Sequence, residues 1–287
     1  MPLRFRRAAL LSFGIYESHN DNADRPTLPT TATINVLKKE FWDKRGDYEW
    51  TKGMVHHSTR ENGISIKYSI HYIETKVGSL MVVWITFRGT VDWKNWVANA
   101  TCTLVPSAYA GSEGTKVHGG FHISYNSIRN QLLRDISSLE KNVYSITIVG
   151  HSLGGALAAN SAFDILHNGS AYGNPRKVEL ITFGAPAVGN QAFVDRFHQL
   201  TATKTGSLPP YCFVNHFDPV PYSIKFKKDV VAVQVNSQMG KTFLSQGEVF
   251  HPNTDKYPSY LRRQIHWRCK DYGPSSAQRT RRQKYCS

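Results

Sequence analysis

The sequence lacks long apolar runs and uses little cysteine. No stretch approaches the ~18 consecutive apolar residues of a membrane-spanning helix, although 40% of the 287 residues are hydrophobic. The four cysteines lie far apart without a C-x-x-C pair; they are Cys102, Cys212, Cys269 and Cys286. Spacing alone neither selects a pairing nor excludes free thiols. The composition excludes an integral membrane protein and is typical of an ordinary globular chain.

Motifs of nucleotide-dependent and metal-dependent enzymes are also absent. The sequence contains no P-loop, no dinucleotide fingerprint and no H-E-x-x-H pattern. His118 and His122 are four residues apart and could share a helix face, but no third metal ligand accompanies them. His56 and His57 fit a solvated loop. We therefore predict no metal and no cofactor.

Acidic residues are outnumbered, with 21 Asp and Glu against 35 Lys and Arg, for a net charge of +14. Anionic surfaces should attract such a chain, so transient contact with a lipid or anionic membrane surface is expected. A role in binding nucleic acid would depend on charge alone and is not predicted. The basic, apolar segment 4–15 is followed by no small-residue cleavage site, so we interpret it as a first helix and not as a signal peptide. Location, secreted or cytoplasmic, and oligomeric state stay open.

Strand and helix patterns alternate along the middle of the chain. Alternating or continuous apolar runs predict strands at 64–72, 80–87, 145–150, 178–183, 211–215 and 230–235, of which the first is half-buried and forms a hairpin with the second. Helical periodicity predicts helices at 4–15, 121–139, 156–166 and 191–200. This order predicts an α/β fold with a mostly parallel central sheet and helices on both faces. We expect one domain over residues 1–272 and a basic tail at 273–287.

The stretch from Ser145 to Ala159 organises this prediction. Its β-branched run ends at Gly150-His151-Ser152-Leu153-Gly154 and passes into small residues that suit a helix. In a G-x-S-x-G turn between strand and helix, the middle residue is strained and its side chain is lifted off the sheet. Ser152 is therefore the candidate nucleophile.

A serine nucleophile needs a base, and the base needs an orienting acid. Asp218 is the candidate acid, because it lies just past a predicted strand, where such sheets place functional groups, whereas Asp164 and Asp195 fall inside helical patterns. His266 is the preferred base because large side chains surround it, and His251 is the alternative.

A tetrahedral oxyanion also needs hydrogen-bond donors. One candidate is the backbone N–H of Leu153, directly after the nucleophile and at the start of the following helix. The second is Thr90, which follows a central strand and offers both an N–H and a hydroxyl.

An ordered set of motifs resembles the fungal-type triacylglycerol lipases, also called class 3 lipases. The motifs are Phe87-Arg88-Gly89-Thr90, Val117-His118-Gly119-Gly120-Phe121, Gly150-His151-Ser152-Leu153-Gly154-Gly155, Ile181-Thr182-Phe183-Gly184-Ala185-Pro186 and Asp218-Pro219-Val220-Pro221. The resemblance spans roughly Ala8 to Tyr272. It implies an α/β-hydrolase fold, ester hydrolysis without a cofactor, and the roles given above for Ser152, Asp218, Thr90 and Leu153. It departs from the family around His266, which follows Gln264-Ile265 where the family usually has an aspartate.

In that family, the segment after the oxyanion residue carries a helical lid that opens at a lipid surface. Trp93, Trp96 and Val97 would form its apolar face, or the two tryptophans belong to the core. The expected function is a serine ester hydrolase acting on lipid esters, first triacylglycerol or monoacylglycerol. The alternatives are a phospholipase A1, a feruloyl-type esterase, or a catalytically silent homologue that binds lipids or partners.

Overall fold

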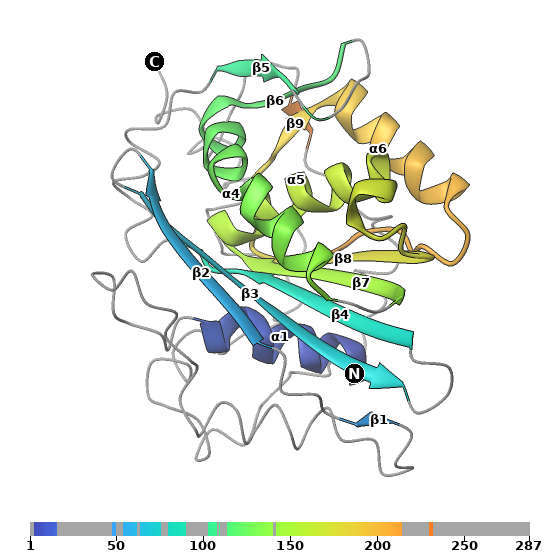
Figure 1. Ribbon diagram of the computed structural model, residues 1–287. Helices are drawn as coiled ribbons and strands as arrows, with labels where there is room; N and C mark the ends of the chain where they lie inside the picture. The colour runs from blue at the N-terminus through green and yellow to red at the C-terminus, as the bar shows by residue number, and fades with distance from the viewer. Residues whose placement is uncertain are drawn as a thin grey trace, which may run out of the picture.

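The computed structural model describes residues 3–15, 48–49, 54–61, 64–75, 80–89, 103–107, 109, 114–139, 142–213 and 230–231 (Figure 1). The helices are α1 (Leu3–Gly14), α4 (Gly119–Ser137), α5 (Leu153–His167) and α6 (Gln191–Thr203), with a 3₁₀ turn η2 (Gly169–Tyr172). The strands of the main sheet are β1 (Tyr48–Glu49), β2 (Met54–Glu61), β3 (Ile64–Thr75), β4 (Leu80–Phe87), β7 (Asn142–His151), β8 (Lys177–Phe183) and β10 (Tyr211–Phe213). A smaller sheet contains β5 (Leu104–Pro106), β6 (Lys116–His118), β9 (Gly189–Asn190) and β11 (Val230–Val231).

The main sheet has a parallel centre and an antiparallel edge. Its order is β1-β3-β4-β7-β8-β10, with β2 also paired to β3. The strands from β4 to β10 are parallel to their neighbours, whereas β3 is antiparallel to β4, β1 and β2. The predicted hairpin and the parallel strands after it are thus confirmed, and the carboxyl ends of β4, β7 and β8 meet at one edge.

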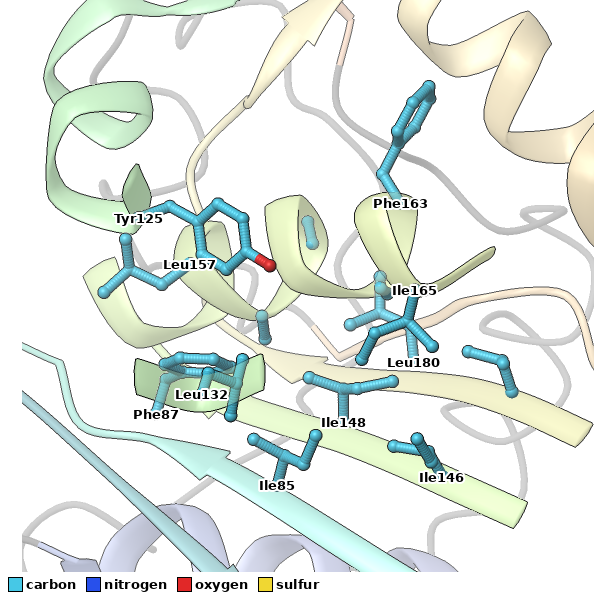
Figure 2. Close-up of a cluster of buried hydrophobic side chains, with 14 of the residues drawn as sticks. Ile85, Phe87, Tyr125, Leu132, Ile146, Ile148, Leu157, Phe163, Ile165 and Leu180 are labelled. Atoms are coloured by element: carbon cyan, nitrogen blue, oxygen red, sulfur yellow. The ribbon is translucent and has the colours of Figure 1, made fainter. Parts of the chain in front are cut away.

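Helices cover both faces of this sheet, as predicted. Figure 1 shows α4 and α5 on one face and α1 on the other. On the α5 face the strands contribute aliphatic side chains, among them Ile85, Ile146, Ile148 and Leu180, which gather beneath α5 (Figure 2). The predicted apolar stripe is confirmed, because all of its members are buried, although the last one lies just beyond the end of α4 at Ser137: Phe121, Tyr125, Ile128, Leu132, Ile136 and Leu139. All residues of α5 from 153 to 166 are buried, so this helix lies inside the molecule.

On the α1 face of the sheet, the side chains of β3 are polar but nevertheless buried. Lys67, Ser69 and His71 of β3 are each less than 5% exposed, so the expectation of a half-buried strand is wrong. Glu179 of β8 is buried on the same side of the sheet and lies 3.4 Å from Nε of Arg4 on α1. Alternation of polar and apolar residues predicted strand geometry correctly, but it could not predict that the polar side is covered.

The small sheet was not predicted as such, because its strands are too short to show periodicity. It links segments far apart in the chain, with β6 antiparallel to both β5 and β9, and β11 antiparallel to β9. The backbone N–H of His118 also donates to the carbonyl of Val188 at 2.9 Å. The predicted strand at 230–235 therefore joins this sheet at residues 230–231 and not the main one.

His56 and His57, expected in a loop, lie on β2. The predicted basic tail at 273–287 lies outside the described residues.

Candidate active site

Ser152 occupies a sharp turn between β7 and α5. Its backbone has φ 55° and ψ −127°, a region that residues other than glycine rarely adopt. Its N–H donates to the carbonyl of Phe183 in β8 at 2.9 Å, and its own carbonyl accepts from the N–H of Gly155 at 2.9 Å. The strained serine is therefore held from both sides, at the carboxyl edge of the sheet where the sequence predicted it.

The glycines around Ser152 are required by close backbone packing. A Cβ on Gly150 would lie 2.2 Å from the carbonyl oxygen of Gly154, and a Cβ on Gly154 would lie 2.2 Å from that of Phe87. A Cβ on Gly155 would lie 2.6 Å from Cβ of Ala185. Side chains cannot be accommodated at such distances, so the turn can sit tightly against β4 and β8 only with glycine at these positions.

The hydroxyl of Ser152 is not used to cap α5. At the start of α4, the Nδ1 atom of His118 accepts a hydrogen bond from the N–H of Phe121, and at the start of α6, Asn190 caps the N–H of Phe193. Ser152 precedes α5 in the same way but makes no side-chain capping bond. A serine at such a position ordinarily caps the helix. The turn therefore orients this hydroxyl away from that role, as a nucleophile requires.

The amino end of α5 lies directly beside this serine. Leu153 is the first residue of α5, so its N–H is among the donors that have no acceptor within the helix. The helix dipole adds partial positive charge at this end. An oxyanion formed on a substrate at Ser152 could accept a hydrogen bond from the Leu153 N–H.

Two histidines near this edge are kept neutral by desolvation. Burial lowers the pKa of His118 to about 4, and desolvation lowers the pKa of His151 to about 4. At neutral pH neither adds positive charge to a helix start. His118 caps α4, which agrees with a bracing role and not with metal binding. In the part of the chain that the structure describes, no group of three or more His, Cys, Asp or Glu could hold a metal ion.

The remaining predicted site residues lie outside the described residues. They are Thr90, Asp218 and His266, the alternative base His251, and the lid candidates Trp93, Trp96 and Val97. The structure does place the segments that lead to two of them, because β4 ends beside the turn of Ser152 and β10, which precedes Asp218 in sequence, lies next to β8. Ser152 and Leu153 are thus described, and the catalytic roles of all these residues stay predictions.

Sequence reasoning missed a buried polar cluster behind α5. Asp164 is fully buried, and its carboxylate accepts hydrogen bonds from five donor atoms: Tyr125 Oη at 2.8 Å, Tyr172 Oη at 2.6 Å, Arg129 Nε at 2.6 Å, Arg129 Nη2 at 3.0 Å and Asn168 Nδ2 at 2.7 Å. Tyr109 extends the cluster through a hydrogen bond to Asn160. Asp164 is not a predicted site residue, because it falls inside a helical pattern. The spacing of four residues between Asp164 and Asn168 is the one sequence signal for a contact between them. Sequence spacing could not pair Asp164 with Arg129, because Arg129 lies on α4.

Comparison with known proteins agrees with this geometry. A family model described as Lipase (class 3) matches residues 84–227, which include the second half of β4, the turn of Ser152 and Asp218. The chain belongs to the class 3 lipase family. Within that family it is similar to a lipase from Rhizomucor miehei, 33% identical over 157 residues. It is also similar to phospholipase A1-II 1 from rice, 32% identical over 190 residues.

These class 3 lipase relatives are longer proteins. The matched region covers 54% of this chain and 41% of the Rhizomucor lipase, and 60% of this chain and 44% of the rice phospholipase. The chain thus matches less than half the length of either relative. The solved structure of Rhizomucor miehei triacylglyceride lipase superimposes with a TM-score of 0.53 at 22% identity, over 80% of this chain and 76% of that one. The fold is therefore the expected α/β-hydrolase fold. No described helix is both long and apolar enough to cross a membrane.

Proposed function

We propose that this protein is a serine hydrolase that cleaves lipid carboxylic esters, with Ser152 as nucleophile. The observation that supports it most strongly is the φ of 55° at Ser152, between a parallel strand and a buried helix, with the hydroxyl not engaged in capping. Such strain persists only where the surrounding structure enforces it, and it is commonly part of a mechanism. Membership of the class 3 lipase family supports the same reading.

The proposed reaction proceeds through an acyl-enzyme. Ser152 Oγ attacks the ester carbonyl while His266 accepts its proton, and Asp218 orients the imidazole. The N–H of Leu153 and the N–H or hydroxyl of Thr90 stabilise the oxyanion. The alcohol leaves with the proton from His266, and water then hydrolyses the acyl-enzyme by the same route. We do not assign the base to His118, which caps α4, or to His151, which ends β7, because burial lowers the pKa of each to about 4.

A chromogenic short-chain ester assay tests the proposal. Ser152→Ala should reduce kcat by about 10³-fold or more while leaving the urea unfolding midpoint nearly unchanged, since only a hydroxyl without a capping bond is removed. If the wild-type protein hydrolyses no ester above the Ser152→Ala background, the catalytically silent homologue that binds lipids becomes the better reading.

The choice of base needs its own pair of variants. His266→Ala should abolish hydrolysis and His251→Ala should leave it largely intact. The opposite result would assign the base to His251. Asp218→Asn should also lower kcat strongly, because the imidazole would then be held in the wrong tautomer.

The substrate class is proposed at the level of lipid esters, with triacylglycerol or monoacylglycerol first. A phospholipid is the second candidate, because a rice protein named phospholipase A1 is 32% identical over 190 residues. Product analysis with a triacylglycerol emulsion and with phospholipid vesicles separates the two, because free fatty acid appears from only the accepted substrate.

A lid formed by Trp93, Trp96 and Val97 is proposed with the same activity. If these residues meet a lipid surface, tryptophan emission should shift to the blue on adding detergent micelles to Ser152→Ala protein. The shift should disappear when Trp93 and Trp96 are both replaced by Phe. A wild-type spectrum that micelles leave unchanged would assign both tryptophans to the core.

A further inference from the structure

Both side-chain amide hydrogens of Asn168 are engaged at the end of α5. Its Nδ2 atom donates to Asp164 Oδ1 at 2.7 Å and to the backbone carbonyl of Tyr109 at 3.0 Å. A primary amide nitrogen carries two hydrogens, and here both are used. The backbone N–H of Asn168 also donates to the carbonyl of Asp164 at 2.7 Å. Asn168 therefore closes the Asp164 cluster at the carboxyl end of the helix.

Every side chain that contacts the Asp164 carboxylate in this cluster is a hydrogen-bond donor. Asp164 accepts from five donor atoms, and Arg129 supplies the positive charge that its carboxylate needs. The hydrogen bond to Asp164 raises the pKa of Arg129 above its usual value. Burial, followed by the charge of Asp164, raises the pKa of Tyr125 and Tyr172, so both hydroxyls stay protonated as donors. Among these contacts, no further hydrogen-bond donor or positive charge is available for a second acceptor or a second negative charge.

Asn168 is followed by Gly169. Asn-Gly is the dipeptide most prone to cyclise to a succinimide, because glycine has no side chain to shield its backbone nitrogen. The Gly169 nitrogen attacks Cγ of Asn168, the Cγ–Nδ2 bond breaks and ammonia leaves, forming a succinimide. Water then opens the ring and leaves an aspartate or an isoaspartate. This chemistry is one reason why asparagine counts among the thermolabile residues.

We infer that Asn168 is a latent deamidation site, protected in the native protein by the Asp164 cluster. Ring closure requires the side chain to leave both hydrogen bonds and the backbone to rotate away from its native ψ of 37°. The native state therefore blocks the reaction, and local opening at the end of α5 permits it.

An ionised carboxylate at residue 168 cannot restore the native hydrogen bonds to the Asp164 cluster. A carboxylate at residue 168 would place an oxygen where Nδ2 now lies, 2.7 Å from Asp164 Oδ1. Two ionised carboxylates cannot share such a site, so one must take up a proton or move away. Deamidation thus converts a reversible opening of α5 into irreversible loss of the native cluster, whatever reaction the protein catalyses.

Peptide mapping by mass spectrometry tests the protection. The full-length protein is incubated at mildly alkaline pH, either native or in concentrated urea. The chain contains one other Asn-Gly step, Asn62-Gly63, which serves as the reference for intrinsic rate in urea. Asn168 should convert as fast as Asn62 in urea and at least about tenfold more slowly in the native protein, the factor that an opening free energy of about 1.4 kcal/mol produces. Equal rates at Asn168 in both conditions would overturn the inference.

Two variants test the consequence. Gly169→Ala shields the nitrogen at little structural cost, because the added Cβ would meet only the flexible end of Lys204, at 3.0 Å, and Asn174 Oδ1, at 3.4 Å. It should slow both the conversion of Asn168 and the loss of refolding yield at elevated temperature, whereas the rate of conversion of Asn62 in the same protein should not change. Asn168→Asp should unfold at lower urea concentration than wild type. An unchanged midpoint for Asn168→Asp, or an undiminished loss of refolding in Gly169→Ala, would contradict the inference.

Discussion

At the scale of single residues, backbone geometry around Ser152 accounts for both the sequence motif and the chemistry proposed for it. The motif G-x-S-x-G-G allowed the strained serine and the flanking glycines to be predicted, because the turn requires a positive φ and close packing at fixed spacing. The partners of the glycines could not be predicted. Phe87 and Ala185 lie far from them in sequence and approach only because β4 and β8 flank β7.

The close approach of Gly154 to β4 predicts a large loss of stability on substitution. Gly154→Ala should lower the free energy of unfolding by more than about 3 kcal/mol, because the new Cβ would lie 2.2 Å from a backbone oxygen that cannot move independently. Gly114→Ala is the matched control. Its φ is 82°, but no atom of the described residues would lie within 4 Å of an added Cβ, so the substitution should cost only about 1 kcal/mol. Urea unfolding compares them, and equal losses would mean that crowding at Gly154 is relieved by a shift of the turn.

His118 predicts a pH dependence of stability. Its pKa is lowered to about 4 in the folded protein and is about 6.5 when unfolded. As pH falls from 6.5 to 4, the unfolded chain binds a proton that the folded one does not, so stability is lost at about 1.4 kcal/mol per pH unit. His118→Asn keeps a capping oxygen at the start of α4 but cannot titrate. Urea midpoints between pH 4.5 and 7 should therefore fall less steeply for the variant, and parallel curves would refute the assignment.

At the scale of elements, long amphipathic helices and the central strands could be predicted, and short or covered elements could not. The apolar stripe of α4 and the small residues of α5 each match the element that the structure contains. Strands of two or three residues, such as β9 and β6, have no periodicity to read. The burial of His71 could not be anticipated either, because a polar strand face is usually solvated and only the fold places cover over it.

The docking of α1 brings Arg4 to the buried Glu179. Burial raises the pKa of Glu179, and the charges of Lys177 and Arg4 only partly oppose this effect. A carboxyl whose folded pKa is raised contributes less stability as pH rises through that pKa. Glu179→Gln should therefore be at least as stable as wild type at pH 8, and this advantage should narrow at pH 4, where the carboxyl is protonated. Thermal unfolding of the variant and of wild type at the two pH values measures this difference in stability. If Glu179→Gln loses more stability relative to wild type at pH 8 than at pH 4, the ion pair with Arg4 dominates.

At the scale of the whole molecule, burial removes slightly more negative than positive charge from the described surface. Three acidic residues of the described part, Asp135, Asp164 and Glu179, are buried, and so are two cationic residues, Lys67 and Arg88. Cationic side chains such as Arg134, Arg176 and Lys116 are exposed. The excess of positive charge therefore faces solvent, where it acts on large anionic partners.

This surface predicts binding to anionic lipid. Ser152→Ala protein, which cannot consume the membrane, should cosediment with vesicles containing phosphatidylglycerol and not with pure phosphatidylcholine vesicles. Raising the salt from about 0.05 M to about 0.5 M should weaken the binding, because screening shortens the reach of surface charges. Binding of the same strength to neutral vesicles at high salt would instead indicate an apolar attachment.

The small sheet has a consequence for how the chain folds. Its strands come from positions between 104 and 231, so its contacts span long stretches of sequence, whereas the β3–β4 hairpin joins neighbouring segments. Contacts between distant segments pay a larger loop-closure entropy and form late. During synthesis, β7, Ser152 and α5 emerge well before β11 can pair with β9. The chain thus acquires its candidate nucleophile before β11 completes the small sheet.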